Sequence, residues 1–183
     1  LDSDNEKILL EEISSLYEQL NITTDELEKK NLLQKIDTIS IDLSSKAVPG
    51  ELDRIYTHLG ARYTNAHTGF EETVYKNDIP SGEIERWLKI EKERFFQAVM
   101  RFFSNELEVI YEEYNQEQDD DFMKVSNELM SSLFPNHPYG SRTILGKSNH
   151  LKKTSIKKLN EYRKTWYIPA NMAIAICGDI EFE

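Results

Sequence analysis

Apolar residues recur at helical spacing along most of this chain, and one segment breaks the pattern. Near the N-terminus the spacing is three or four residues, which places the side chains on one helix face; they are Leu9, Ile13, Leu16 and Leu20. Residues 61–67 and 72–78 are instead rich in Tyr, Thr and Val, with Thr68-Gly69 between them, which predicts a β-hairpin. Together the two patterns predict an α+β fold with helices packed on a mostly antiparallel sheet.

Residues 1–48 predict a helical hairpin. Ser3 with Glu6, and Thr23 with Glu26, each match the capping box that begins a helix. The second helix carries an apolar stripe on one face, formed by Leu32, Ile36, Ile39 and Leu43.

Several shorter elements are expected further along the chain. Gly60 stands where a left-handed C-cap would end a short helix, and Pro80-Ser81 begins the next helix. The most strongly helical stretch extends from Ser104 to about Phe134. Residues 135–140 predict an irregular connection, because their two prolines and one glycine disfavour both a helix and a central strand.

Two elements are expected near the C-terminus. A helix is marked by Ile156, Leu159, Tyr162 and Trp166. Met172 to Cys177 is an unbroken apolar run, which predicts a strand buried on both faces. Cys177 is the single cysteine, so no internal disulfide can form, and we expect its side chain in the core.

Composition limits the class of protein. The 183 residues, 39% of them hydrophobic, suffice for one domain with its own core. The net charge of −11 opposes a nucleic-acid partner, because binding phosphates requires a basic face. No apolar run approaches the roughly 20 residues needed for a membrane span, and no signal peptide is present. The chain begins at Leu1 rather than Met, so we expect that residues precede it.

One stretch departs from the acidic balance of the chain. Between Lys147 and Lys164, basic residues gather around the last predicted helix; they include Lys152, Lys153, Lys157, Lys158 and Arg163. Two interpretations remain open. The residues form either a solvated helix face or a surface that docks an acidic partner.

Two glutamates in the central helical stretch share a helix face. Glu106 and Glu113 are seven residues apart, so their side chains lie nearly in line, beside Val109 and Ile110. Spacing alone leaves two interpretations. Either both carboxylates are solvated, or the face turns inward and the carboxylates require a metal, a cation or a hydrogen-bond donor.

The octet Glu106 to Glu113 resembles the second metal-site helix of the pitrilysin/insulinase family of zinc metalloproteases, the inverted zincins. In that family two glutamates at this spacing flank a hydrophobic pair. The resemblance implies that Glu113 is the third zinc ligand and that Glu106 supports the catalytic site from behind it.

Further blocks in the same order extend the resemblance over roughly residues 50–183. Asn65, Ala66, His67 and Thr68, followed by Thr73-Val74-Tyr75, resemble the family's edge strand, which implies that they bind the peptide substrate. An exposed edge suits that role because its backbone groups can pair with an extended peptide. Leu133 to Gly146 and Tyr162 to Asp179 resemble the segments that follow in the family. The hairpin of residues 1–48 resembles an insertion of a bacterial subgroup.

The family's His-x-x-Glu-His motif is missing, since the four histidines do not occur at that spacing; they are His58, His67, His137 and His150. The motif would supply two zinc ligands and the general base. We expect that it lies upstream of Leu1 and that the chain alone is inactive. Each histidine is then a surface or packing residue, except that His67 is placed to contact a peptide.

The resemblance yields one set of expectations for the whole chain. Residues 1–183 form a single truncated peptidase-type domain, part of a mitochondrial-processing-peptidase-like metallohydrolase fold, with a hairpin insertion at 1–48 and a core at 49–183. The cofactor of the intact protein is zinc, and the partners are a peptide substrate and a second half-domain or sister subunit. Export of bacterial family members suggests the periplasm or cell envelope.

Two other functions compete with an active zinc peptidase. The chain could belong to a non-catalytic homologue that binds peptides or a sister subunit along the edge of Asn65 to Thr68. It could also be a helical interaction module built on residues 1–48. The paired glutamates favour the peptidase, because a protein that only binds has no need of them.

Overall fold

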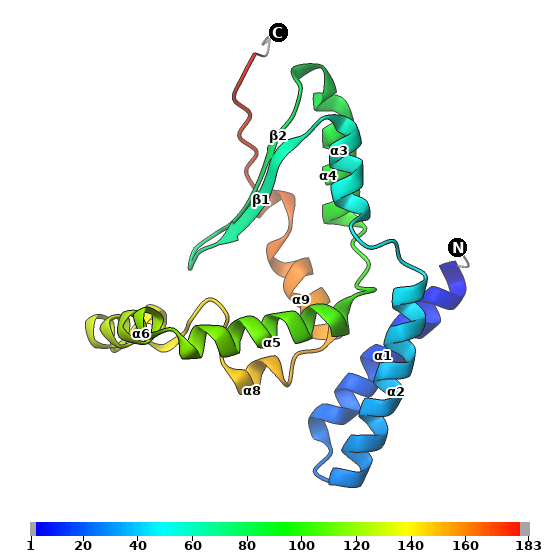
Figure 1. Ribbon diagram of the computed structural model, residues 1–183, viewed down its shortest axis with the longest axis vertical. Helices are drawn as coiled ribbons and strands as arrows, with labels where there is room; N and C mark the ends of the chain where they lie inside the picture. The colour runs from blue at the N-terminus through cyan, green and yellow to red at the C-terminus, as the bar shows by residue number, and fades with distance from the viewer. Residues whose placement is uncertain (1–2, 180–183) are drawn as a thin grey trace. The chain divides into compact units, whose positions relative to one another are not determined.

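The computed structural model describes residues 3–179 of the chain, and they fold into two compact units (Figure 1). Unit 1 is built from residues 1–47 and 100–158, and unit 2 from residues 48–99 and 159–183. The chain therefore leaves unit 1 after the N-terminal hairpin, builds most of unit 2, and returns. Each unit is described separately below.

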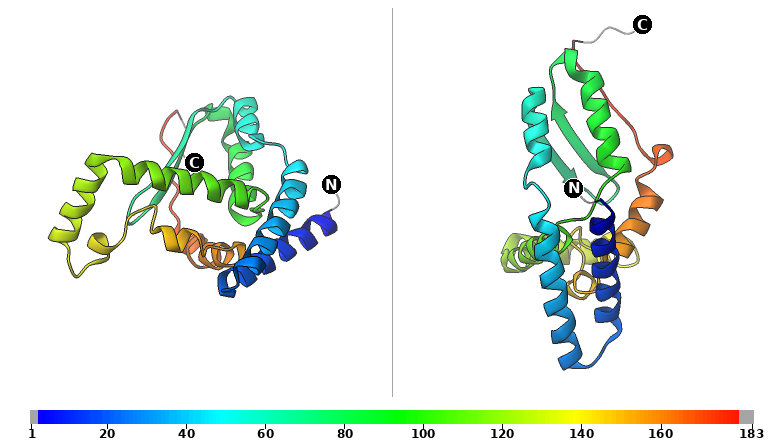
Figure 2. Two further views of the ribbon diagram at one scale, coloured as in Figure 1. Left: turned by 60° about the horizontal axis from the view of Figure 1, so that its bottom comes forward. Right: turned by 90° about the vertical axis from the view of Figure 1, so that its right-hand side faces the viewer.

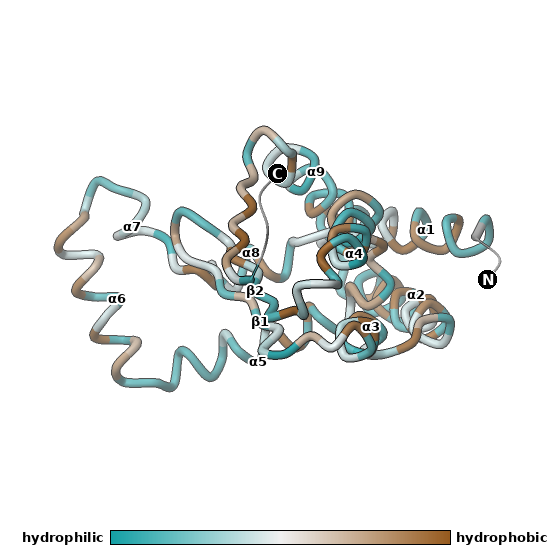
Figure 3. Tube along the Cα trace, turned by 90° about the horizontal axis from the view of Figure 1, so that it is seen from above, coloured by the Kyte–Doolittle hydropathy of each residue, from teal (hydrophilic) through white to brown (hydrophobic). Residues whose placement is uncertain are grey.

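Unit 1 begins with two helices that pack side by side, α1 (Ser3–Ile22) and α2 (Glu26–Ser45), as the sequence predicts. The stripe Leu32, Ile36, Ile39 and Leu43 is buried against Ile13, Leu16 and Tyr17 of α1. Apolar and polar stretches alternate along both helices in Figure 3, as expected for helices with one buried face. This helix pair contributes most of the buried apolar residues of the unit.

The caps of this hairpin differ from the predicted ones. The side chain of Ser3 lies outside the described residues, and Glu6 forms an ion pair with Arg101 rather than closing a capping box. Helix α2 is capped by Asp25, whose carboxylate accepts hydrogen bonds from the amides of Leu27 and Glu28. Asp25 competes successfully with Thr23 because it stands directly before the first helical residue.

The central helical stretch is two helices rather than one. Helix α5 (Phe103–Asp119) ends at Asp120, which is extended at φ −79° and ψ 116° and caps α6 (Asp121–Leu133). The Asp120 carboxylate accepts hydrogen bonds from the amides of Phe122 and Met123. A short polar side chain thus offers the backbone an alternative to a continuous helix. The sequence pattern does not show this break, because apolar residues continue at helical spacing on both sides of it.

Residues 135–140 are more regular than predicted, because Pro138 begins a one-turn helix, α7 (Pro138–Ser141). Proline is tolerated there because the first helical position needs no amide donor. Gly140 is required by space, since a Cβ at this position would lie 2.3 Å from the Phe134 carbonyl oxygen. A second one-turn helix, α8 (Ser148–Leu151), precedes α9 (Ile156–Trp166), which starts in unit 1 and ends in unit 2.

Unit 2 contains the predicted β-hairpin. Helix α3 (Glu51–Leu59) ends at Gly60 in the left-handed conformation, φ 84°, and leads into β1 (Arg62–Thr68). Strand β2 (Thr73–Asp78) pairs antiparallel with β1, and the 3-10 turn η1 (Ser81–Glu83) leads into α4 (Ile84–Phe96). Helices α3 and α4 lie along one face of the hairpin, as Figures 1 and 2 show.

The apolar run Met172 to Cys177 is not the predicted buried strand. After the 3-10 turn η2 (Pro169–Asn171), residues 172–177 have no regular secondary structure and are exposed, Cys177 included. Within residues 3–179 the sheet has two strands, β1 and β2, and neither pairs with this run. An apolar run becomes a strand only where a neighbouring strand accepts its backbone hydrogen bonds. The described residues are therefore mostly helical with one two-stranded antiparallel sheet, which is compatible with part of the predicted α+β fold.

None of the helices in the described part of the chain combines the length and the apolar character needed to cross a bilayer.

The stripe of α2 gives a direct test of unit 1. Ile36 is 1% exposed, and Ile36→Ala should lower the free energy of unfolding by about 2–5 kcal/mol, because truncation leaves a cavity. Leu33, on the same helix, is 46% exposed, so Leu33→Ala is the matched control and should cost less than about 1 kcal/mol. Urea denaturation followed by circular dichroism measures both. Equal losses would contradict the assignment of the buried face.

Candidate functional site

Helix α5 presents the two glutamates singled out by the sequence. Glu106 and Glu113 both lie inside the helix, about two turns or roughly 10 Å apart along its axis. Both side chains are exposed, and Val109 between them is 52% exposed. This face of α5 is therefore uncovered within the described residues, and the carboxylates are free to meet a ligand there.

The first turn of α5 is fixed by the α1–α2 hairpin. Phe103 is buried and packs edge-on against Tyr17 of α1, with ring centroids 4.9 Å apart. The Ser104 hydroxyl lies 2.9 Å from the Tyr17 hydroxyl and 2.7 Å from that of Ser40 on α2. These contacts come from both helices of the hairpin, so the start of the glutamate helix cannot shift without breaking them.

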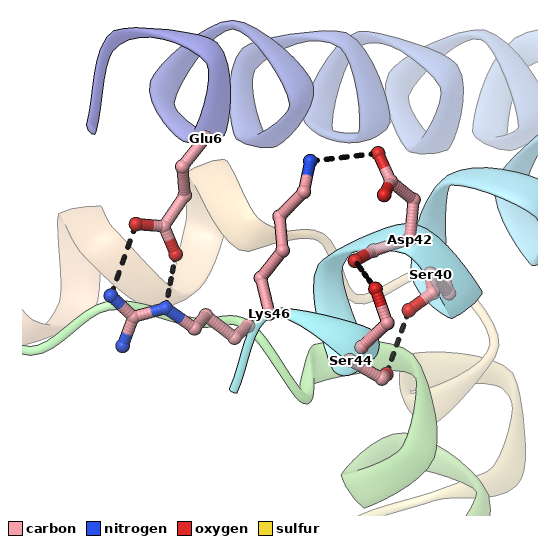
Figure 4. A network of polar contacts seen from close by, with 7 residues as sticks. Glu6, Ser40, Asp42, Ser44 and Lys46 are labelled. Carbon is pink, nitrogen blue, oxygen red and sulfur yellow. Dashed lines mark hydrogen bonds and ion pairs between the residues drawn. The ribbon is translucent and has the colours of Figure 1, made fainter. Parts of the chain in front are cut away.

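An ion pair holds the segment just before α5. Arg101 donates hydrogen bonds to both carboxylate oxygens of Glu6, one of them at 3.0 Å, and Figure 4 shows these contacts from close by. The hydrogen bond from Arg101 lowers the pKa of the Glu6 carboxyl, against the opposing effect of its burial. Lys46, which also pairs with Asp42 at 2.9 Å, contributes to the same lowering.

The described residues do not complete a zinc site by themselves. Within the described residues no group of three or more His, Cys, Asp or Glu side chains is placed to hold a metal ion. Zinc in proteins takes three or four protein ligands, whereas Glu113 offers one carboxylate. All four histidines are exposed, and two serve the local backbone: His58 contacts the Arg54 carbonyl at 2.6 Å and His137 accepts from the Tyr139 amide at 3.2 Å.

The predicted peptide-binding edge is strand β1. All seven of its residues are exposed, and among the described strands it pairs with β2 alone, so its other edge is open. Asn65 lies opposite Lys76, Ala66 opposite Tyr75, and His67 opposite Val74. Residues opposite one another in a sheet share a face. Hence Asn65 and His67 lie on one face of the hairpin, and Ala66 and Thr68 lie on the other.

The second of these faces is anchored to α4. Tyr75 of β2 packs edge-on against Phe95, and the Arg94 guanidinium lies 4.4 Å from the centre of the Tyr75 ring. Burial is the largest contribution raising the pKa of Tyr75, which reaches about 12. Since α4 covers the face of Tyr75, Asn65 and His67 lie on the face away from α4.

Sequence reasoning missed the buried pair that ties α3 to α4. Glu91 of α4 is 9% exposed and accepts a hydrogen bond from the hydroxyl of Tyr56, which is 2% exposed. Burial and this bond raise the pKa of Tyr56 to about 12. Arg94 balances the buried charge at 3.6 Å from Glu91. In the sequence, Glu91 is one of many helical glutamates, and no local signal marks it as buried.

Tyr63 was also missed. It lies at an irregularity of β1, between the paired residues Arg62 and Asn65, with φ 49° and 83% of its surface exposed. A left-handed aromatic residue is rare, and bulges of this kind redirect side chains beside binding sites. The exposed ring therefore lies two residues before Asn65.

The comparisons with known proteins agree with the family resemblance. No protein-family model matches the chain. It is 23% identical over 167 residues, or 84% of its length, to a probable zinc protease PqqL of Haemophilus influenzae. It is 26% identical over 67% of its length to a chloroplastic stromal processing peptidase of Arabidopsis thaliana. A probable mitochondrial-processing peptidase subunit beta of the same plant is 27% identical over 75% of the chain.

These relatives are much longer, since the chain spans 17%, 10% and 25% of their respective lengths. Their names describe a probable zinc protease, a processing peptidase and a subunit of a processing peptidase, in line with the resemblance to zinc metalloproteases.

The Glu6–Arg101 pair predicts a pH-dependent contribution to stability. Because the folded-state pKa of Glu6 is lowered from 4.5, its contribution is fully present above that pH and is lost as the pH falls through the folded-state value. Glu6→Gln should therefore cost about 1–2 kcal/mol near pH 7, and the difference from the unsubstituted chain should shrink below pH 4.5. Glu11→Gln, at an exposed position of α1, is the control. A deficit that does not change with pH would contradict the ion pair.

Proposed function

We propose that this chain is a portion of a zinc-dependent metalloendopeptidase domain, to which it supplies the third zinc ligand and the substrate-binding edge strand. In this proposal Glu113 is the ligand and Glu106 supports it as a catalytic residue. The observation that carries the proposal is the uncovered face of α5, on which both carboxylates are exposed and in line. The distant similarity to named zinc proteases and processing peptidases supports it.

The chemistry assigns distinct tasks to residues of this chain. Zinc, when bound, would polarise the scissile carbonyl and a water molecule. Glu113 would contribute one anionic oxygen ligand, and Glu106, about two helical turns away, would help to orient the ligand shell and offset the positive charge of the metal. The remaining ligands and the general base must come from imidazoles and a carboxylate that the described residues do not provide. The chain by itself is therefore proposed to be inactive.

Peptide binding is proposed to occur along Asn65, Ala66, His67 and Thr68. The open edge of β1 offers backbone donors and acceptors to an extended peptide whatever its sequence. Asn65 and His67 present polar side chains on the face away from α4, where a peptide side chain could meet them.

The second candidate is a non-catalytic homologue that binds a peptide or a sister subunit through the same edge. It is favoured by one observation, that a relative is named as a subunit of a processing peptidase. A second half-domain or sister subunit is also a proposed partner of the active enzyme. Location in the periplasm or cell envelope, and the absence of a nucleic-acid partner, belong to the same proposal.

Substitution of neighbouring glutamates tests the proposed ligand. In a protein that carries this chain together with a His-x-x-Glu-His helix, Glu113→Ala should abolish zinc retention and lower peptide hydrolysis by at least about a thousandfold. Glu112→Ala removes the same charge about 100° around the helix and should change hydrolysis less than about threefold. Zinc is measured by mass spectrometry and hydrolysis with a quenched fluorescent peptide.

The second candidate predicts different results in the same experiment. If neither substitution alters zinc content while the protein still captures peptides, the non-catalytic homologue is the better account. The 183-residue chain alone serves as the reference and should show negligible hydrolysis and no submicromolar zinc binding by calorimetry.

A further inference from the structure

Five exposed lysines of unit 1 gather within twelve residues along α8 and the start of α9; they are Lys147, Lys152, Lys153, Lys157 and Lys158. We call them the α8–α9 lysine cluster. The chain has 33 acidic residues against 22 lysines and arginines, so acidic partners are plentiful. Even so, none of the ion pairs among residues 3–179 uses a lysine of this cluster.

The contacts that these lysines do make are with neutral groups. Lys158 donates a hydrogen bond of 2.8 Å to the carbonyl oxygen of Lys153. The Lys152 ammonium lies 5.5 Å from the centre of the Tyr111 ring. The nearby carboxylate of Glu18 accepts a hydrogen bond from the buried Ser155 hydroxyl at 2.6 Å and forms no ion pair with the cluster. No ion pair among the described residues therefore neutralises the positive charge of the cluster.

The cluster is separate from the proposed zinc ligand. It adjoins α5 through Tyr111, whose hydroxyl lies 3.4 Å from that of Ser148. Hydrogen bonds from Ser148 and Lys152 lower the pKa of the Tyr111 phenol. Tyr111 precedes Glu113 by two residues, which places it about 200° around the helix axis. The cluster thus lies toward the opposite side of α5, and its function does not depend on the zinc proposal.

We propose that the α8–α9 lysine cluster is a docking surface for an acidic segment of a partner protein, one that carries several Asp or Glu residues in an extended stretch. Crowded like charges repel one another, and an anionic partner relieves that repulsion. Opposite charge also steers the encounter, so association should depend steeply on salt. A nucleic acid is the less suitable partner, because its long phosphate backbone would meet the field of a chain with a net charge of −11.

Fluorescence anisotropy with a labelled peptide of eight glutamates tests this proposal on the full chain. The chain should bind this peptide at least about tenfold more tightly than a matched peptide of glutamines, and the preference should fade between about 50 and 300 mM salt. Lys147, Lys153 and Lys157 are replaced by alanine in the test variant, because their ammonium groups make no hydrogen bond or ion pair within the described residues. This variant should bind the acidic peptide about tenfold more weakly.

The control variant replaces Lys7, Lys30 and Lys35, which are exposed on α1 and α2, and changes the net charge equally. It should weaken binding less than about twofold. Equal losses in the two variants would show that net charge alone governs binding and would overturn the proposal. Equal affinity for the two peptides, or absence of binding, would do the same.

Three further measurements distinguish other occupants of the cluster, and the first two do not require the variants. Chemical-shift changes on adding the acidic peptide should centre on residues 147–158, and changes centred elsewhere would refute the assignment. Tighter binding of a single-stranded oligonucleotide of equal charge would replace the acidic protein segment with a nucleic acid. Sedimentation should show that the chain does not self-associate through the cluster. Dimers that disappear when Lys147, Lys153 and Lys157 are replaced by alanine would identify a second copy of the chain as the partner.

Discussion

The attachment of α5 to the α1–α2 hairpin is the constraint on which the candidate site depends. Phe103 is buried against Tyr17, and the Ser104 hydroxyl is shared between Tyr17 and Ser40, so the first turn of α5 is fixed from two helices. Glu106 follows two residues later. The hairpin thus supports the helix that carries the glutamates. Within unit 1, the role of the hairpin is to hold the first turn of α5 in place.

The same attachment bears on the three functions considered from the sequence. A helical module that acts alone would leave its apolar faces free for a partner, but α1 and α2 pack against each other, and Tyr17 of α1 packs against the buried Phe103. The peptidase and the non-catalytic homologue share the edge strand β1 and differ in what the paired glutamates do. Whether the paired glutamates of α5 bind a metal therefore decides between the two functions.

Local sequence patterns correctly predicted the elements that are determined by residues close together in the sequence. The stripe of α2, the left-handed Gly60 and the β-hairpin were all correct, because side-chain periodicity and glycine geometry determine them within a few residues. The break at Asp120 was missed because apolar spacing continues across it while one carboxylate caps a new helix. The buried strand predicted for Met172 to Cys177 was wrong because a strand needs a neighbouring strand, and the sequence of a single segment does not reveal whether one is present.

The residues of the site divide in the same way. The spacing of Glu106 and Glu113 predicted that they share a face of one helix, and they do. Whether that face meets a metal depends on groups that the described residues do not include, so no pattern within them could decide the matter. Glu6 and Glu91 are buried by partners far away in the sequence, Arg101 and Tyr56, and a glutamate carries no local mark of such a partner.

The central proposal is that Glu113 binds zinc. Diffraction at the zinc absorption edge, from crystals of a protein that carries this chain with a His-x-x-Glu-His helix, tests it most directly. The account predicts an anomalous peak about 2.0–2.2 Å from a Glu113 carboxylate oxygen. A zinc ion held without Glu113 would contradict it.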